Sequence, residues 1–344
     1  MGLYPLFENQ YRIISIVGMA KNAGKTVTLN HLIEVLDANH VSFGLTSIGR
    51  DGERQDIVTN TDKPMIYVKK GTYIATAEML FNLSEAKMAV EEVTDYHTAM
   101  GRVIIGRTLT DGYVQIGGPS TNLAVNAVSE KMLEKGAGYV LVDGALDRSS
   151  SASPAITDAC ILATGAVLSR DMAKAVAKTA HRASLFALPH DIDESSLRLW
   201  EVAEETRNVI LIDSDGSHVV MDGFRTALNA GRAIGELIDE NTRALLFPGA
   251  LTTKTIMEIV HTTQYYKNIE FIVGDATKIF IEHSDWQYFM RIGVDIKVRY
   301  GIRLLAVTVN PYAPAGYFYD GAIFKSALAK RISGVPIVDV LEGV

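Results

Sequence analysis

The residues best suited to chemistry lie near the N-terminus, in residues 18–26, which read GMAKNAGKT. A loop that ends in Gly-Lys-Thr just before a helix can bring backbone N–H groups up to phosphate oxygens, where the partial positive charge of the helix N-terminus also acts. Lys25 can balance the charge of the β and γ phosphates, and the Thr26 hydroxyl can coordinate Mg²⁺. This order of residue types predicts a binding loop for a nucleoside triphosphate.

The spacing of this loop departs from the usual pattern. Five residues separate Gly18 from Gly24, where four are usual, and Met19 stands in the place of the first glycine. We therefore predict a variant loop. The residues expected to contact the nucleotide are Gly18, Lys21, Asn22, Ala23, Gly24, Lys25, Thr26 and Val27. No Asn-Lys-x-Asp motif reads the base, so the choice between ATP and GTP stays open.

A magnesium site also needs a carboxylate, and Asp143 is the best candidate. It closes the apolar run YVLVD, and its loop would lie beside the phosphate loop if the two strands are neighbours. A turn or helix-capping aspartate is the alternative. Asp51 and Glu53 follow another strand, where a metal-linked switch at residues 49–62 is one interpretation and a charged surface loop is the other. The expected metal residues are thus Thr26, Asp143 and Asp51, and the expected catalytic residues are Lys25 and Asp143.

Three further segments are candidates for binding a second substrate or an anion. Thr72 and Thr76 lie among the lysines of VKKGTYIATAE, residues 117–122 begin a predicted helix, and residues 310–312 (NPY) end an apolar strand. Helix caps and turns account for all three segments without a ligand.

These residues need a scaffold of alternating strands and helices. Residues 12–18 predict a strand and residues 24–38 a helix. The further strands expected are residues 41–48, 65–68, 139–143, 159–163, 209–213, 244–247, 271–273 and 303–309, and the further helices expected are residues 76–89, 122–135, 169–183, 191–207, 224–238 and 253–262. Asp111-Gly112 predicts a hairpin within residues 102–118.

Continuous apolar strands that alternate with helices are typical of a parallel sheet covered on both faces. We therefore predict an α/β protein: a parallel-sheet phosphate-loop domain at residues 1–190, followed by a smaller α/β domain at residues 208–344 that binds a partner or ligand. The 344-residue length fits two domains.

Composition narrows the possible partners. The net charge is −7 without a basic run, which argues against nucleic acid, and no apolar run reaches membrane-spanning length. The single cysteine, Cys160, lies in an apolar run and is expected to be a buried thiol in a reducing cytoplasm. His181, His190 and His218 lack ligand spacing, so no zinc site is expected.

The order of GMAKNAGKT, VLVDGALDR and CILATGAVLSRDMAKAVAKTA resembles the branch of P-loop NTPases that includes dethiobiotin synthetase, the ParA and MinD ATPases and metallocentre-insertion GTPases. The resemblance covers about residues 12–188. It implies a strand end at residues 163–165 beside the nucleotide. Many members carry an extra lysine early in the loop that reaches a neighbouring subunit's phosphate, and Lys21 stands one position later.

The whole chain also resembles, as an overall similarity, the smaller subunits of reactivases that serve lysine 5,6-aminomutase. That resemblance implies a chaperone that uses ATP or GTP with Mg²⁺ to hold or release a cobalamin-dependent aminomutase, together with a second reactivase subunit. The alternatives are a small-molecule ligase of the dethiobiotin-synthetase type and a nucleotide-binding module without hydrolysis. Whether the chain also forms a homo-oligomer stays open.

Overall fold

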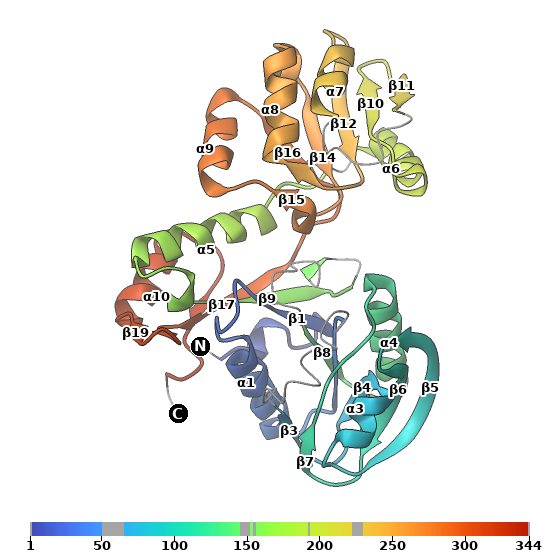
Figure 1. Ribbon diagram of the computed structural model, residues 1–344, viewed down its shortest axis with the longest axis vertical. Helices are drawn as coiled ribbons and strands as arrows, with labels where there is room; N and C mark the ends of the chain where they lie inside the picture. The colour runs from blue at the N-terminus through green and yellow to red at the C-terminus, as the bar shows by residue number, and fades with distance from the viewer. Residues whose placement is uncertain are drawn as a thin grey trace. The chain divides into compact units, whose positions relative to one another are not determined.

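The computed structural model is a mixed α/β protein, and nine α-helices lie in its described part. It describes residues 2–49, 65–144, 152–153, 156–191, 193–221 and 230–342. The chain divides into unit 1, Met1–Ala180 with Arg303–Val344, and unit 2, His181–Ile302 (Figure 1). Within the described ranges, no helix is long and apolar enough to cross a membrane.

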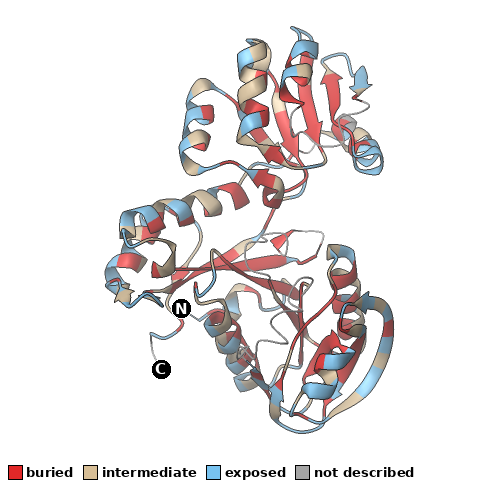
Figure 2. Cartoon of the chain, viewed as in Figure 1, coloured by how far each residue is buried: buried red, intermediate tan, exposed pale blue. Residues whose placement is uncertain are grey.

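Unit 1 is built on a nine-stranded sheet. In spatial order its strands are β20 (Ile337–Val338), β17 (Leu304–Asn310), β9 (Ala159–Gly165), β1 (Ile13–Gly18), β8 (Tyr139–Asp143), β2 (Phe43–Ser47), β4 (Tyr73–Ala77), β6 (Gly101–Thr108) and β5 (Met88–Thr98). The first seven run parallel, and β6 is antiparallel to both of its neighbours. The central strands are buried along their length, whereas the edge strand β5 alternates between exposed and half-buried residues, with Thr94 buried (Figure 2).

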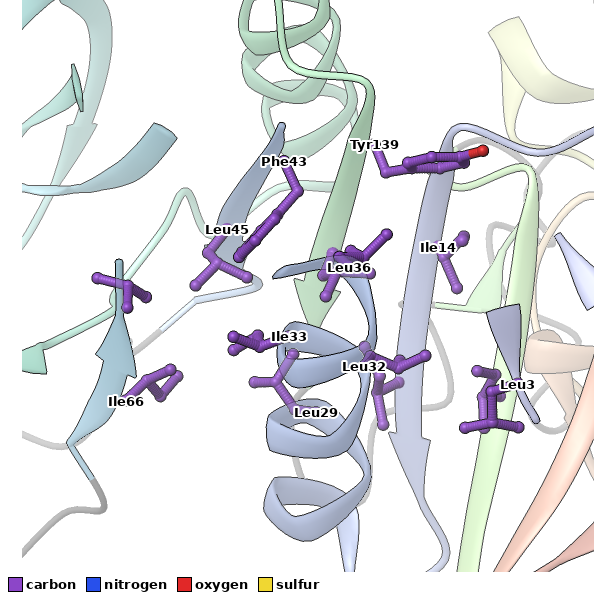
Figure 3. Packing of buried hydrophobic residues seen from close by; sticks show 14 of the residues in the cluster. Leu3, Ile14, Leu29, Leu32, Ile33, Leu36, Phe43, Leu45, Ile66 and Tyr139 are labelled. Carbon is purple, nitrogen blue, oxygen red and sulfur yellow. The ribbon is translucent and has the colours of Figure 1, made fainter. Parts of the chain in front are cut away.

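Helices cover both faces of this sheet. They are η1 (Tyr4–Leu6), α1 (Lys25–Ala38), α3 (Glu78–Leu83), α4 (Asn122–Glu134), η3 (Ala166–Leu168), α5 (Met172–Phe186), which carries the boundary between the units, and α10 (Gly321–Ala329). On one face, Leu29 and Leu32 of α1 pack with Ile14 of β1 (Figure 3). On the other face, Val128 of α4 packs with Val140 of β8. Because successive strand residues point to opposite faces, one apolar strand supplies both cores.

Unit 2 has its own five-stranded sheet. The order is β11 (His218–Val220), β10 (Ile210–Asp213), β12 (Thr242–Phe247), β14 (Glu270–Val273) and β16 (Asp295–Val298), with the last three parallel and β10 antiparallel to its neighbours. Its other elements are α6 (Glu194–Thr206), α7 (Gly231–Leu237), β13 (Leu251–Thr252), α8 (Thr253–Thr262), η4 (Tyr265–Asn268), η5 (Ala276–Lys278), β15 (Ile279–Phe280) and α9 (His283–Ile292). Gly231 lets α7 approach α8, since a Cβ there would lie 2.5 Å from the Thr255 carbonyl oxygen.

Two expectations for local structure are wrong. The hairpin joins β5 to β6, whereas Asp111-Gly112 leads from β6 into β7 (Gly112–Val114), which pairs with β3 (Ile66–Val68). Residues 76–89 form the end of β4, the short α3 and the start of β5 rather than one helix. Both errors have one cause: these segments take their structure from distant strands, and short-range propensity yields to tertiary pairing.

The chain after Ile302 returns to unit 1. The predicted second domain at residues 208–344 is therefore wrong in its C-terminal part. Strand β17 pairs with β9, and β20 follows it at the edge of the same sheet. Between them lie α10 and a two-stranded hairpin of β18 (Tyr312–Ala313) and β19 (Tyr317–Phe318). Unit 2 is therefore an insertion in the chain of unit 1, and its first residue lies within α5.

Candidate functional site

The predicted phosphate loop lies, as expected, between a strand and a helix. Strand β1 ends at Gly18, and α1 begins at Lys25 after Gly24 in the left-handed region, with φ of 99°. The first bond within the helix runs from the Thr28 N–H to the Gly24 carbonyl, at 2.9 Å. The amides of residues 25–27 therefore have no carbonyl to bond inside the helix, and Gly24 at the N-cap has no side chain that could bond to them. Such a helix start attracts anions.

The extra residue in the loop has a simple structural account. The Met19 N–H donates to the Ala163 carbonyl of β9 at 2.9 Å, so Met19 continues the edge of the sheet. The Ala23 N–H then donates to Ala20 at 3.2 Å and closes a turn. Four residues remain between Met19 and Gly24, as in the usual pattern. Met19 thus occupies the place of the first glycine, and Gly18 belongs to the strand.

The remaining loop residues differ in exposure. Lys21 and Asn22 are exposed, and Asn22 has a positive φ of 64°. Ala23 is buried beneath them. Val27 is exposed on the first turn of α1. Of the residues predicted to contact the nucleotide, Ala23 and Gly18 are therefore buried, whereas Lys21, Asn22 and Val27 are exposed.

Lys25 and Asp143 meet, as the sequence predicted if their strands are neighbours. Strand β1 pairs directly with β8, with Ile16 opposite Asp143. The Lys25 Nζ lies 2.9 Å from Asp143 Oδ1 and donates a hydrogen bond to the Gly144 carbonyl. Their side chains are 16% and 28% exposed, so the pair is only partly screened by water.

The oxygens around this pair suit a magnesium ion. Asp143 Oδ1 is shielded from solvent and, within the described residues, accepts no hydrogen bond of good geometry. The Thr26 hydroxyl lies on the first turn of α1, where its residue is half-buried. Mg²⁺ takes oxygen ligands and is usually held by one or two protein groups together with phosphates and water. The described residues hold no cluster of three or more His, Cys, Asp or Glu side chains, and such a site needs none.

Sequence reasoning missed the support that this loop receives from β17. The Thr28 hydroxyl of α1 shares a buried hydrogen bond of 2.7 Å with Thr308. The Asn310 side chain donates to the Asn22 carbonyl at 3.1 Å. Nothing local in residues 303–310 indicates these contacts, because they depend on which sheet the strand joins.

The other predicted segments serve the fold. Thr76 is buried and bonds to Gln115 and Gly117, and Thr72 bonds to Lys69. Thr121 caps α4 by accepting from Ala124 at 3.3 Å. Asp51, Glu53 and the switch segment at residues 49–62 lie outside the described residues, apart from Gly49. The buried Cys160 thiol has a raised pKa because burial disfavours the thiolate, and it is free as expected.

The site thus combines a helix N-terminus whose N-cap is a glycine, a lysine paired with a strand-end aspartate, and the hydroxyl of Thr26. Together these groups can hold a phosphate chain with a divalent cation. Comparison with known proteins found no matching family model, no matching curated protein and no matching solved structure.

Proposed function

We propose that unit 1 binds ATP or GTP with Mg²⁺ at the N-terminus of α1, and that the protein is a P-loop reactivase subunit for a cobalamin-dependent aminomutase. The observation that carries the nucleotide site is the pairing of Lys25 with Asp143 beside the uncapped start of α1. The client, the second reactivase subunit and a cytoplasmic location rest on the resemblance and composition of the chain.

Within this proposal, nucleotide binding replaces the Lys25–Asp143 ion pair. A triphosphate competes with Asp143 for the Lys25 ammonium, because both are anions within reach of the same side chain. Its phosphates also take the free amides of the first turn. Asp143 and the Thr26 hydroxyl are then available to the metal, which would neutralise charge on the β and γ phosphates. Nucleotide binding therefore exchanges one ion pair for another.

A nucleotide titration of the wild type and Lys25→Ala tests the site. Calorimetry with MgATP and MgGTP should show binding to the wild type that is weakened roughly 10- to 100-fold in the variant, since a bond to a charged group contributes about 1.5–3 kcal/mol. The matched control is Lys69→Ala. Lys69 pairs with Asp37 at 3.7 Å near the other end of α1, and this change should leave the affinity unaltered.

Asp143→Asn separates the metal from the phosphate contacts. The amide keeps the size of Asp143 but loses its charge, so nucleotide affinity should depend less on Mg²⁺. Equal affinity in Lys25→Ala and the wild type would refute the site. An unchanged magnesium dependence would leave Asp143 a purely structural residue.

Hydrolysis assays then distinguish the three functional hypotheses. Stimulation by an added cobalamin-dependent aminomutase supports the reactivase. Hydrolysis that appears only with a small carboxylic acid substrate would favour the ligase, and tight binding without turnover would favour the non-hydrolysing module. The ligase has less support, because Thr72 and Thr76 already bond within the fold.

A further inference from the structure

We infer that Asn310 is a positioning residue that fixes the conformation of the phosphate loop and connects the loop to the β18–β19 hairpin. This inference rests on the proposed nucleotide site. It adds Asn310 to that site and predicts that the β18–β19 hairpin responds to nucleotide binding. The starting observation is that one side chain bonds to both segments. Asn310 Nδ2 donates to the Asn22 carbonyl at 3.1 Å, and Asn310 Oδ1 accepts from the Tyr312 N–H at 3.1 Å.

The bond to Asn22 matters because of how a phosphate loop works. Its N–H groups must face the anion, so its carbonyl groups must face away. Asn22 has a positive φ, which an asparagine tolerates but which its surroundings must maintain. Asn310 holds the Asn22 carbonyl from the side of β17 and so favours the loop conformation that leaves the amides free.

Packing fixes Asn310 in this place. A Cβ on Gly24 would lie 3.0 Å from the Asn310 Cβ, so the loop is already in close contact with this side chain. On the other side, a Cβ on Gly165 would lie 2.5 Å from the Asn310 carbonyl oxygen, and the two residues are partners in the β9–β17 register. Because Asn310 has little room to drift, a shift of the loop has to change its hydrogen bonds.

The hairpin at the other end of this connection presents an aromatic pair. Tyr312 and Phe318 are 62% and 72% exposed, and their ring centroids lie 6.2 Å apart. The hairpin is anchored elsewhere: the Tyr317 hydroxyl donates to the Ala166 carbonyl at 2.8 Å, and the Tyr319 hydroxyl donates to the Ser169 carbonyl. With these anchors in place, the bond from the Tyr312 N–H to Asn310 is the link that responds to the loop.

Hydrogen exchange of the wild type with and without MgATP or MgGTP tests this connection, with affinity measured in parallel by calorimetry. Nucleotide should change the exchange of amides in residues 311–319. In Asn310→Ala this response should vanish, and the affinity should fall about tenfold, as expected for the loss of one orienting hydrogen bond. Asn310→Asp keeps the acceptor for Tyr312 but loses the donor to Asn22, so the hairpin should stay protected yet no longer respond.

The matched control is Asn126→Ala, which also removes a side-chain amide that donates to a backbone carbonyl, that of Ile156 at 3.2 Å. It should keep both the affinity and the hairpin response. Protection of the Cys160 thiol in each variant shows that unit 1 is folded. Wild-type binding with an unchanged hairpin, or a full response in either Asn310 variant, would overturn the inference while the nucleotide site stands. Absence of wild-type binding would instead remove the proposed function, and the inference with it.

Discussion

Both units contain a parallel strand followed by a glycine-bearing loop and a helix, with the short strand β13 before the helix in unit 2, and the two helix starts differ. In unit 1 the start of α1 carries no side-chain cap. In unit 2, the Thr252 hydroxyl caps α8 by accepting from the Thr255 N–H, and Thr253 bonds to Asp285 at 3.1 Å. A side-chain cap therefore occupies an amide of the first turn of α8, whereas Gly24 offers none to α1. This difference sets the proposed binding site of unit 1 apart from the helix start of unit 2.

The lysines near these two loops extend the comparison. Lys278 of unit 2 donates to the Pro248 carbonyl at 3.0 Å, much as Lys25 of unit 1 donates to Gly144. Lys25 also has Asp143 as a partner for its charge, at the edge of the neighbouring strand. A lysine that holds only a carbonyl stabilises a turn, whereas one that also neutralises a carboxylate can exchange that anion for another.

The two units can be followed separately in one solution experiment. Both tryptophans, Trp200 and Trp286, lie in unit 2, and the single cysteine, the buried Cys160, lies in unit 1. Tryptophan fluorescence therefore reports the unfolding of unit 2, and thiol reactivity reports the opening of unit 1.

The largest effect is expected for Gly24→Ala in the open helix start. The change places a Cβ at positive φ, 3.0 Å from the Asn310 Cβ, which should cost unit 1 about 1–3 kcal/mol and distort the loop. Nucleotide binding should be lost, as measured by calorimetry. Gly136→Ala is the control, since Gly136 also has a positive φ, 111°, but follows Lys135, the C-cap of α4. Equal nucleotide affinity in the two variants would contradict the comparison.

A smaller effect is expected for Thr252→Ala in the closed helix start. Loss of the cap should destabilise unit 2 by about 1 kcal/mol, measured by urea unfolding with tryptophan fluorescence. Thr252→Ser keeps the hydroxyl and should restore most of this stability. Equal stability of the alanine and serine variants would show that the cap is unimportant.

The smallest effect is expected in the pH dependence of the stability of unit 2. Burial lowers the pKa of His181 below its ordinary value of 6.5, and the neighbouring His283 and Arg182 lower it further. Its contribution to stability is thus fully present above about pH 6.5 and is lost as the pH falls through the lower pKa of the folded state. Fluorescence-monitored unfolding of unit 2 should show this loss, and His181→Gln should reduce it. An identical pH slope in the variant would contradict the assignment.

Local patterns predicted the elements that form the site. The spans expected for β8 and α8 match the structure, and the order of strand, loop and helix around Lys25 is confirmed. Strand β5 was missed because its exposed acidic residues hide the alternation of a half-buried strand. The pairing of β17 with β9 could not be predicted, because a buried strand carries no local mark of its neighbours. Asn310 was for that reason assigned to a turn or pocket rather than to the phosphate loop.

The insertion of unit 2 sets a time order for the appearance of the site during synthesis. Residues 181–302 leave the ribosome before β17, which carries both Thr308 and Asn310. At roughly 5–20 residues per second, this interval lasts on the order of ten seconds. During that time the nascent chain already has Lys25 and Asp143 but lacks the strand that contacts the loop before Lys25. The strand that steadies the proposed phosphate loop is therefore made only after all of unit 2.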